Sequence, residues 1–336
     1  MQLNSKTSEF SWYPLLLISP FFFWGTAMVA MKGTIEHTTP LFMASVRLLP
    51  AGLLVLAVTG WQKRPQPQNR KAWLWIALFA LIDGAMFQGF LSEGLVRTDA
   101  GLGSVMIDSQ PLAVALLSSF LFGEVIGGVG FLGLGIGILG ISLIGLPESL
   151  IVNLWEGNSE SLSATWLDFC QGGQWLMLLA ALSMALGTVI IRFVSRHVDT
   201  IVATGWHMVL GGLLLLVLSG NLESQQWQAL NFHDWLALAY STVFGSAISY
   251  GVFFYLAAKG NLTSLSSLTF LTPVFALTFG NLFLAEVLTP IQWLGVCLTL
   301  VSIYLINQRE KLVEIFSNLG NKVTEAFSEK IQKVKS

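Results

Sequence analysis

Long apolar stretches, each about as long as a membrane-spanning helix, recur along this chain of 336 residues. A helix needs about 20 mostly apolar residues to cross the hydrocarbon core of a bilayer. Ten stretches approach that length: 13–31, 41–59, 73–95, 100–122, 128–146, 174–191, 202–219, 235–257, 264–284 and 290–307. Runs such as 211–218 lack the apolar–polar alternation of a barrel strand, so the pattern predicts transmembrane helices.

The composition argues against the main classes of water-soluble protein. Lys, Arg, Asp and Glu make up 11% of the residues, against about 25% in soluble domains, and hydrophobic residues make up 54%. A net charge of −2 offers no broad basic surface for nucleic acid. Two cysteines, Cys170 and Cys297, supply neither a disulfide framework nor a zinc site.

Motifs for an enzyme or a cofactor are missing from the sequence. There is no P-loop, zinc-protease helix or nucleophile elbow. The glycine run 135–140 fits a dinucleotide fingerprint, but it lies inside an apolar span with no strand before it. Gly133 and Gly137 form a small-residue motif, so we expect the run to pack helices together.

The basic residues predict the orientation, because cytoplasmic loops of membrane proteins are enriched in Lys and Arg. With the N-terminus inside, the inner segments before the C-terminal tail hold eight Lys and Arg, whereas the outer loops hold two. The connection 147–173 contains four acidic residues and no basic one, which suits the outer face. We therefore expect a multi-pass protein of the plasma (inner) membrane with both termini cytoplasmic.

The two halves of the chain align without gaps at an offset of 162 residues. The most informative matches are Trp73 with Trp235, Pro111 with Pro273, and Glu124 with Glu286. Each half holds five stretches, an odd number, so the second copy would be inverted in the membrane. Inverted repeats recur in secondary transporters, with the substrate site near the bilayer midplane. A duplicated structural bundle without a transport role is the alternative.

The predicted fold class is an all-α membrane protein with ten transmembrane helices in two inverted five-helix repeats. Its segments are an N-terminal cytoplasmic segment 1–12, a first repeat 13–146, an outer loop 147–173, a second repeat 174–307 and a cytoplasmic amphipathic tail 308–336. Apolar residues recur in this tail at helical spacing, so it could lie on the inner leaflet or bind a partner helix. A solvated tail is the alternative.

With these features the sequence resembles the EamA-type family of the drug/metabolite transporter superfamily. The resemblance rests on Trp24-Gly25 in the first span and Arg47 in the second span. It also rests on a proline in the fourth and ninth spans that is followed by a glutamate at the end of the span, Pro111 with Glu124 and Pro273 with Glu286. It covers about residues 13–307. It implies a 5+5 inverted-repeat fold with a central cavity and movement of a small organic solute, often by export. The second half has Leu186 in place of Trp24, so the half-sites are not equivalent.

Five ionisable residues lie inside predicted spans: Arg47, Asp83, Glu93, Asp108 and His207. A charge near the bilayer centre costs at least about 2.5–3.5 kcal/mol, so such residues are functional candidates. In the second half, Gly245 replaces Asp83 and Phe270 replaces Asp108. The duplicated scaffold therefore does not need either acid, which favours a functional role for both.

Asp83 and Asp108 have two functional interpretations and a structural one. Either could bind the amine of a substrate, and either could carry a proton. As structural groups they would instead pair with Arg47 or with backbone donors. Glu93 lies near the outer boundary, where a solvated or gating role is expected. His207 has no second metal ligand near it in sequence, which predicts a satisfied packing residue.

The other site candidates are polar, aromatic and proline residues of the same spans. Ser104 lies one turn before Asp108 and therefore on the same face. Pro111 and Pro273 are expected to kink the fourth and ninth helices at the cavity. Aromatic side chains there would bind apolar or cationic solutes. The predicted substrate site is Trp24, Asp83, Ser104, Asp108, Ser246, Tyr250 and Phe270.

These features predict a secondary transporter that works by alternating access, because the sequence lacks an ATP-binding motif. The resemblance suggests export of a small metabolite such as an amino acid. The expected partners are the lipid bilayer and protons, and the sequence does not fix the oligomeric state. The alternatives are a nucleotide-sugar or phosphate-ester exchanger, a lipid-modifying enzyme and a non-transporting sensor or scaffold. An exchanger of that kind would need several basic residues at the cavity, where the sequence offers Arg47.

Overall fold

The computed structural model describes residues 13–31, 34–97, 106–145, 173–284 and 289–315, and in these ranges the chain is helical without any strand. Within these ranges, seven helices are long and apolar enough to cross a membrane: Tyr13–Ala30, Pro40–Trp61, Arg70–Arg97, Trp175–Val194, Thr200–Leu222, Phe232–Lys259 and Pro290–Asn307. Shorter apolar helices, Gln110–Phe122, Gly127–Leu143 and Leu262–Ala276, lie at the predicted fourth, fifth and ninth spans. The all-helical membrane fold is confirmed, whereas the ten-span inverted repeat stays a prediction.

The chain divides into two compact units, and each unit contains residues from both halves of the sequence. The first unit is formed by Met1–Ala85 and Ile191–Lys259. The second unit is formed by Met86–Ile190 and Gly260–Ser336. The segments 1–12 and 316–336 and most of the loop 147–173 lie outside the described residues.

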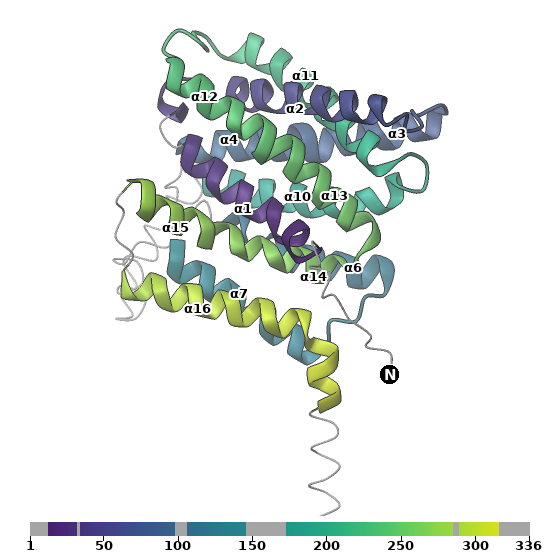
Figure 1. Cartoon of the computed structure of the whole chain (residues 1–336), viewed down its shortest axis with the longest axis vertical. Coiled ribbons are helices and arrows are strands. Elements are labelled where there is room, and N and C mark those ends of the chain that lie inside the picture. Colours follow the sequence, from purple (N-terminus) through teal and green to yellow (C-terminus); the bar gives the residue numbers. More distant parts are fainter. Residues whose placement is uncertain (1–12, 32–33, 98–105, 146–172, 285–288, 316–336) are drawn as a thin grey trace, which may run out of the picture. The chain divides into compact units, whose positions relative to one another are not determined.

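A pair of helices, α2 (Pro40–Trp61) and α11 (Thr200–Leu222), runs side by side in the first unit (Figure 1). Glycines allow this close approach. A Cβ on Gly52 would lie 2.7 Å from the Gly205 carbonyl oxygen, and a Cβ on Gly212 would lie 2.9 Å from the Leu49 nitrogen. Close backbone packing at small residues is typical of helix pairs in membranes.

Hydrogen bonds and an ion pair link α2 and α11 near both ends of the helix pair. At one end, the Glu223 carboxylate accepts hydrogen bonds from the backbone nitrogens of Leu41 (2.8 Å) and Phe42 (3.0 Å). These donors belong to the first turn of α2, where a helix lacks internal acceptors and favours a negative charge. At the other end, Arg64 Nη1 lies 3.0 Å from Asp199 Oδ2. The two contacts fix the antiparallel register of α2 and α11.

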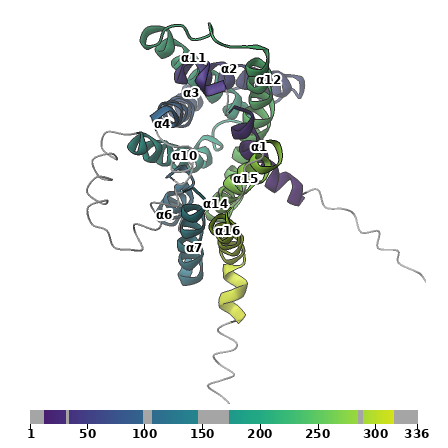
Figure 2. The ribbon, with the colours of Figure 1, turned by 90° about the vertical axis from the view of Figure 1, so that its left-hand side faces the viewer.

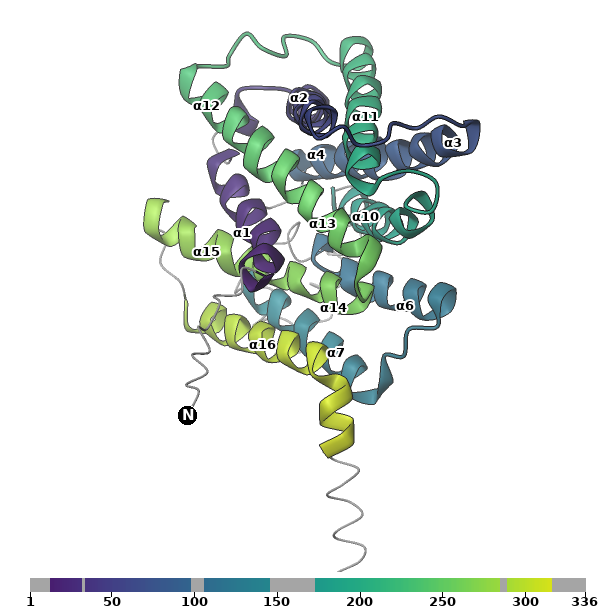
Figure 3. The ribbon, with the colours of Figure 1, turned by 45° about the vertical axis from the view of Figure 1, so that its right-hand side comes forward.

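In the part of the chain that the structure describes, two long apolar helices each contain a π-helical segment. The first runs through α3 (Arg70–Phe79), η2 (Ala80–Phe87) and α4 (Gln88–Arg97). The second runs through α12 (Phe232–Tyr240), η3 (Ser241–Ile248) and α13 (Ser249–Lys259). Helix α1 (Tyr13–Met31) lies along this second helix (Figure 3). Because π-helical turns are rare and concentrate at functional sites, η2 and η3 indicate where to search for one.

In the second unit, α7 (Gly127–Gly145) packs along α16 (Pro290–Asn307) (Figure 2). Ser302 Oγ donates a hydrogen bond to the Gly133 carbonyl oxygen at 2.6 Å. A Cβ on Gly133 would lie 2.7 Å from Ile306 Cγ1, and a Cβ on Gly137 would collide with the Phe270 ring. The prediction that the glycine run packs helices is therefore confirmed.

The repeated prolines lie in the first turns of helices. Pro111 is the second residue of α6 (Gln110–Phe122), directly after a turn at residues 108–109. Pro273 is the third residue of α15 (Leu271–Leu284), which follows the 3-10 segment η4 (Leu268–Phe270). A proline is tolerated in a first turn because its missing N–H would have no partner there. Kinks of the fourth and ninth helices at these prolines therefore stay a prediction.

The glutamate after the fourth span caps another helix of the second unit. Gly123 ends α6 in the left-handed conformation with a φ of 66°, which suits glycine. Glu124 then accepts hydrogen bonds from the backbone nitrogens of Leu262 (3.1 Å) and Thr263 (3.2 Å) at the start of α14 (Leu262–Ser267). The Gly-Glu pair of the first repeat thus has a structural role. In the same unit, Gly94 of α4 packs against α10 (Gln174–Val194).

Candidate functional site

Two ionisable residues from distant parts of the sequence meet in the first unit. Asp83 lies in η2 and His207 lies in α11, 124 residues later. His207 Nε2 is 3.2 Å from Asp83 Oδ2, and both side chains are 1% exposed. Ionisable residues buried in membrane helices are costly and usually mark a functional position. The pair is therefore the centre of the candidate site.

Glycines bring the two helices close enough for this contact. Gly84 follows Asp83 directly, and Gly211 lies one turn after His207. A Cβ on Gly211 would lie 2.6 Å from Gly84 Cα, and a Cβ on Gly84 would lie 2.8 Å from the His207 carbonyl oxygen. Because backbone atoms cannot move aside as a flexible side chain can, η2 and α11 require glycine where they meet.

The His207 ring is held in one orientation by its neighbours. Nδ1 lies 2.6 Å from the Thr204 carbonyl oxygen. A carbonyl oxygen only accepts hydrogen bonds, so Nδ1 carries a hydrogen and donates it. The ring stacks on Phe79 at a centroid distance of 4.1 Å, and it meets Phe254 edge-on at 5.5 Å. These contacts direct Nε2 towards Asp83.

Aromatic rings of α1, α3 and α13 form a connected group beside His207, and we call them the aromatic cluster: Trp24, Phe79, Tyr250, Phe253 and Phe254. The Tyr250 ring lies 6.4 Å from His207 and 5.3 Å from Trp24. Phe253 and Phe254 are fully buried. The Asp83–His207 pair is thus enclosed by apolar and weakly polar surfaces, where electrostatic interactions are strong.

Two buried polar atoms of the site, Asp83 Oδ1 and Trp24 Nε1, have no hydrogen-bond partner among the described residues. Leaving a buried polar atom unsatisfied costs about 1–3 kcal/mol, so each is a candidate contact for a solute or a water molecule. Arg47 of α2 adds a positive charge near Tyr250. The described residues contain no group of three or more His, Cys, Asp or Glu that could hold a metal ion.

Four predicted site residues lie in the first unit: Trp24, Asp83, Ser246 and Tyr250. The structure brings Trp24 and Tyr250 into ring contact, and Tyr250 also contacts His207, the partner of Asp83. Ser246 is buried in η3, one turn before Tyr250.

The partner of Asp83 is the residue that sequence reasoning missed. His207 has a hydrogen-bond contact at each ring nitrogen, as predicted for a satisfied histidine. No local pattern places it opposite Asp83, for which Arg47 or backbone donors were the expected partners. The available signal was that two ionisable residues in apolar spans tend to find one another.

The second unit contains the remaining predicted residues that the structure describes. Asp108 is buried in the turn before α6. Phe270 is fully buried in a hydrophobic core that also contains Leu134 and Ile141, so its ring packs the interior of this unit. Ser104 lies outside the described residues.

Two further polar contacts belong to the second unit. Buried Gln110 donates from Nε2 to Thr188 Oγ1 at 3.2 Å, while its Oε1 has no partner among the described residues. Sequence reasoning did not select this neutral pair. Glu93 forms an ion pair with Arg97 at 2.7 Å, with its side chain 25% exposed, which fits the expected solvated position.

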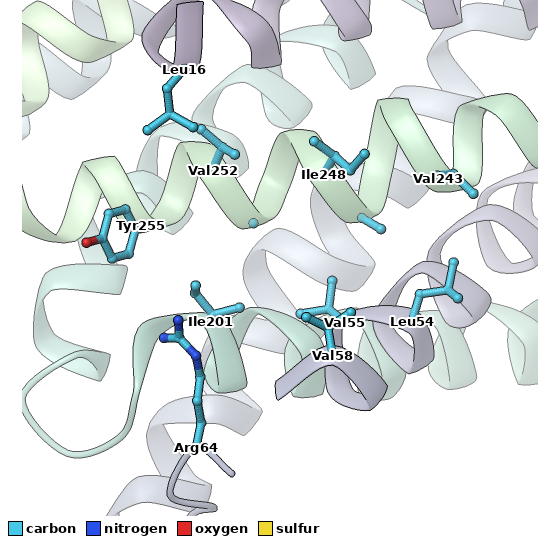
Figure 4. A pocket seen from close by; sticks show the side chains of 12 residues that line it. Leu16, Leu54, Val55, Val58, Arg64, Ile201, Val243, Ile248, Val252 and Tyr255 are labelled. Atoms are coloured by element: carbon cyan, nitrogen blue, oxygen red, sulfur yellow. The ribbon is translucent and has the colours of Figure 1, made fainter. Parts of the chain in front are cut away.

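An apolar pocket of about 570 Å³ opens within the first unit (Figure 4). Aliphatic side chains such as Leu16, Leu54 and Ile201 form most of its lining, and Arg64 and Tyr255 contribute polar atoms. The predicted site residues are not part of this lining. Hydrocarbon suits such a surface better than a polar solute, so we do not assign the substrate to this pocket.

The model of the EamA-like transporter family matches residues 11–146 and 171–308. The chain belongs to the EamA-like transporter family. Its EamA relatives include an uncharacterized transporter of Synechocystis, which is 63% identical over 93% of this chain and 94% of its own length. A chloroplastic WAT1-related protein of Arabidopsis thaliana is 54% identical over 87% of this chain and 68% of its own.

More distant EamA relatives and a solved structure agree with this assignment. An uncharacterized inner membrane transporter of Escherichia coli, YedA, is 26% identical over 86% of this chain and 89% of its own length. A crystal structure of a protein superposes with a TM-score of 0.70, covering 89% of this chain and 98% of that chain. Its 15% identity shows a shared fold only. The family and the names of its members identify this EamA protein as a membrane transporter, which implies a non-enzymatic role.

Proposed function

We propose that this EamA protein is a secondary active transporter that exports a small organic metabolite by alternating access. The observation that carries the proposal is the Asp83–His207 pair, which is 1% exposed and lies within membrane helices. Substrate and coupling-ion sites of secondary transporters lie at such intramembrane positions, where irregular helices expose polar groups. The π-helical segment around Asp83 is an irregularity of this kind.

We further propose ten spans in two inverted repeats, 13–146 and 174–307, joined by the outer loop 147–173. The 162-residue offset and the two ranges matched by the family model support this architecture. A plasma (inner) membrane with both termini cytoplasmic is supported by the basic inner loops and by the name of the Escherichia coli relative. The lipid bilayer and protons are the proposed partners.

The chemistry of the site favours a zwitterionic solute such as an amino acid. Asp83 Oδ1 could accept from an ammonium group, and Trp24 Nε1 could donate to a carboxylate. The aromatic cluster offers ring faces to a cation or an apolar side chain. A nucleotide sugar carries more negative charge than Arg47 alone would balance. Asp108, in the second unit, is the other candidate for contact with the solute.

Counterflow in proteoliposomes tests this proposal. The purified protein would be challenged with amino acids, amines and nucleotide-sugars, each in a separate assay. We expect the wild-type protein to accumulate an amino acid or amine. The variant Trp24→Phe, which removes the indole N–H, should change the apparent affinity for that solute. Glu93→Gln, a change in a partly exposed ion pair, is the matched control and should behave as wild type. If folded protein accumulates nothing across the panel, the transport proposal for these substrates is wrong.

A further inference from the structure

We propose that the Asp83–His207 pair binds the proton that drives transport. This inference rests on the proposed secondary transport and names its coupling ion and the place where that ion binds. It is carried by the hydrogen-bond geometry of the pair, by its enclosure and by the glycine contact beside it.

The geometry fixes how many protons the pair holds. Nδ1 of His207 already carries one hydrogen, which it donates to the Thr204 carbonyl oxygen. Nε2 and Asp83 Oδ2 face each other at 3.2 Å, so a hydrogen bond between them needs one more proton. That proton is on Nε2, facing a carboxylate, or on Oδ2, facing a neutral imidazole. In either arrangement the pair is neutral overall.

Loss of this proton changes both the charge and the contact. The pair would then carry one negative charge, and a carboxylate oxygen would face the lone pair of Nε2. The surroundings offer little compensation, because Phe79 and Phe254 cover the imidazole. Among the described residues, the other charged or titratable groups of the site are Tyr250 of α13, with its ring 6.4 Å from that of His207, and Arg47 of α2, near Tyr250. A buried uncompensated charge is unfavourable, so deprotonation favours separation of Asp83 from His207.

The adjacent backbone links this separation to movement of a helix. Gly84 and Gly211 hold η2 against α11 immediately beside the pair. Segment η2 is π-helical, a rare geometry that is frequent at functional sites, so the helix here lacks the regular hydrogen-bond pattern of an α-helix. The proton therefore stabilises the arrangement in which η2 packs against α11. Its release favours an arrangement in which the two segments are separated. Proton occupancy and helix position are coupled in this way.

The first test observes the proton directly in the full-length protein in liposomes. Solid-state NMR of 15N-histidine-labelled protein would be recorded across a pH series, with His207→Gln used to assign the signal among the four histidines. We expect a pH-dependent step at Nε2 while Nδ1 stays protonated. In Asp83→Asn the step should shift or disappear, because the amide can donate to Nε2 without a dissociable proton. A His207 signal without a pH step, or one unchanged in Asp83→Asn, would overturn the proposal.

The second test separates coupling from transport. Counterflow needs no gradient, whereas accumulation driven by a pH gradient of one unit can reach about ten-fold per proton. Because Asp83 Oδ1 is also a proposed contact of the solute, Asp83→Asn should lower counterflow in part. Its gradient-driven accumulation should fall to the level seen without a gradient, while Glu93→Gln keeps both activities. Gradient-driven accumulation that persists in Asp83→Asn would disprove coupling through this pair. Absence of counterflow in wild type would instead contradict the proposed function, and the NMR titration would still decide whether the pair binds the proton.

Discussion

The π-helical segments η2 and η3 occupy corresponding places in the two sequence halves, yet they differ in chemistry. Segment η2 contains Asp83, buried against His207 of α11. Segment η3 contains no ionisable residue, and Gly245 stands where η2 has the acid. A Cβ on Gly245 would lie 2.7 Å from the Cβ of Ala27 in α1. One segment thus holds a buried ionisable pair, while the other provides a surface for helix packing.

This difference shows how a duplicated scaffold can acquire a single polar centre. Both halves keep the irregular turn, which suggests that its geometry is useful in each. The position that matches His207 in the first half is Ser45, so neither member of the pair has an ionisable counterpart. Transport by two related halves does not require two equivalent sites. We therefore expect substitutions at η2 to affect stability through buried charge, and substitutions at η3 to affect it through helix packing.

The largest effect is expected from removing one member of the pair. His207→Leu leaves Asp83 buried without its partner, which should destabilise the protein by about 3–5 kcal/mol. The double variant Asp83→Ala with His207→Leu removes both charges and should recover more than half of that loss. Denaturant unfolding in micelles measures both values. Equal losses in the single and double variants would show that the pair contributes packing rather than charge.

A smaller effect is expected at the glycine contact beside the pair. Gly211→Ala places a Cβ against Gly84, and this overpacking should cost about 1–3 kcal/mol. Gly220→Ala on the same helix is the control, because nothing lies within 4 Å of its added Cβ. Unfolding midpoints of the two variants test the expectation. Similar midpoints would mean that η2 and α11 can separate slightly without strain.

At η3, we expect Gly245→Ala to cost about 1 kcal/mol through its clash with Ala27, near the low end for overpacking. Ala27→Gly in the same protein creates room and should recover most of this loss, since the two sites are in contact. Thermal unfolding across pH tests this prediction, and the loss should not depend on pH. A pH-dependent loss would indicate that η3 also serves an ionisable group.

The smallest effect is expected for the neutral hydrogen bond next to η3. Thr26 Oγ1 lies 2.8 Å from the Tyr240 hydroxyl, which directly precedes this segment. Hydrogen bonds of this kind between membrane helices contribute about 0.6 kcal/mol on average, so Thr26→Val should cost about that much. The matched variant Tyr240→Phe should give a similar value, and the double variant should not add to it. Additive losses would mean that the two hydroxyls act separately.

Several features of the fold could be predicted from sequence because they depend on local composition. Apolar length identified the membrane helices, and the Gly133–Gly137 motif identified a helix contact. The turn before Pro111 was not predicted, although Asp108-Ser109-Gln110-Pro111 interrupts the apolar run with residues that favour turns. The π-helical segments could not be predicted, since they have no distinctive composition.

For the candidate site, the sequence identified ionisable residues but not their contacts. The cost of burying charge marked Asp83 and His207 independently. Their contact depends on the packing of η2 against α11 at Gly84 and Gly211, and two glycines 127 positions apart give no local signal of it. Phe270 was selected as an aromatic side chain that could line the cavity, yet its ring is fully buried in a hydrophobic core. Aromatic character in a span does not distinguish a cavity surface from the packed interior.

The contacts at both ends of α2 and α11 also have a mechanical consequence. The two helices are tied by Glu223 at one end, by Arg64 and Asp199 at the other, and by glycine packing between them. A helix of 22 residues is about 33 Å long. Two helices of this length that are linked at both ends resist bending and sliding past each other, so we expect them to move as one rigid body. A displacement of α11 at His207 would therefore be shared by α2 along its length.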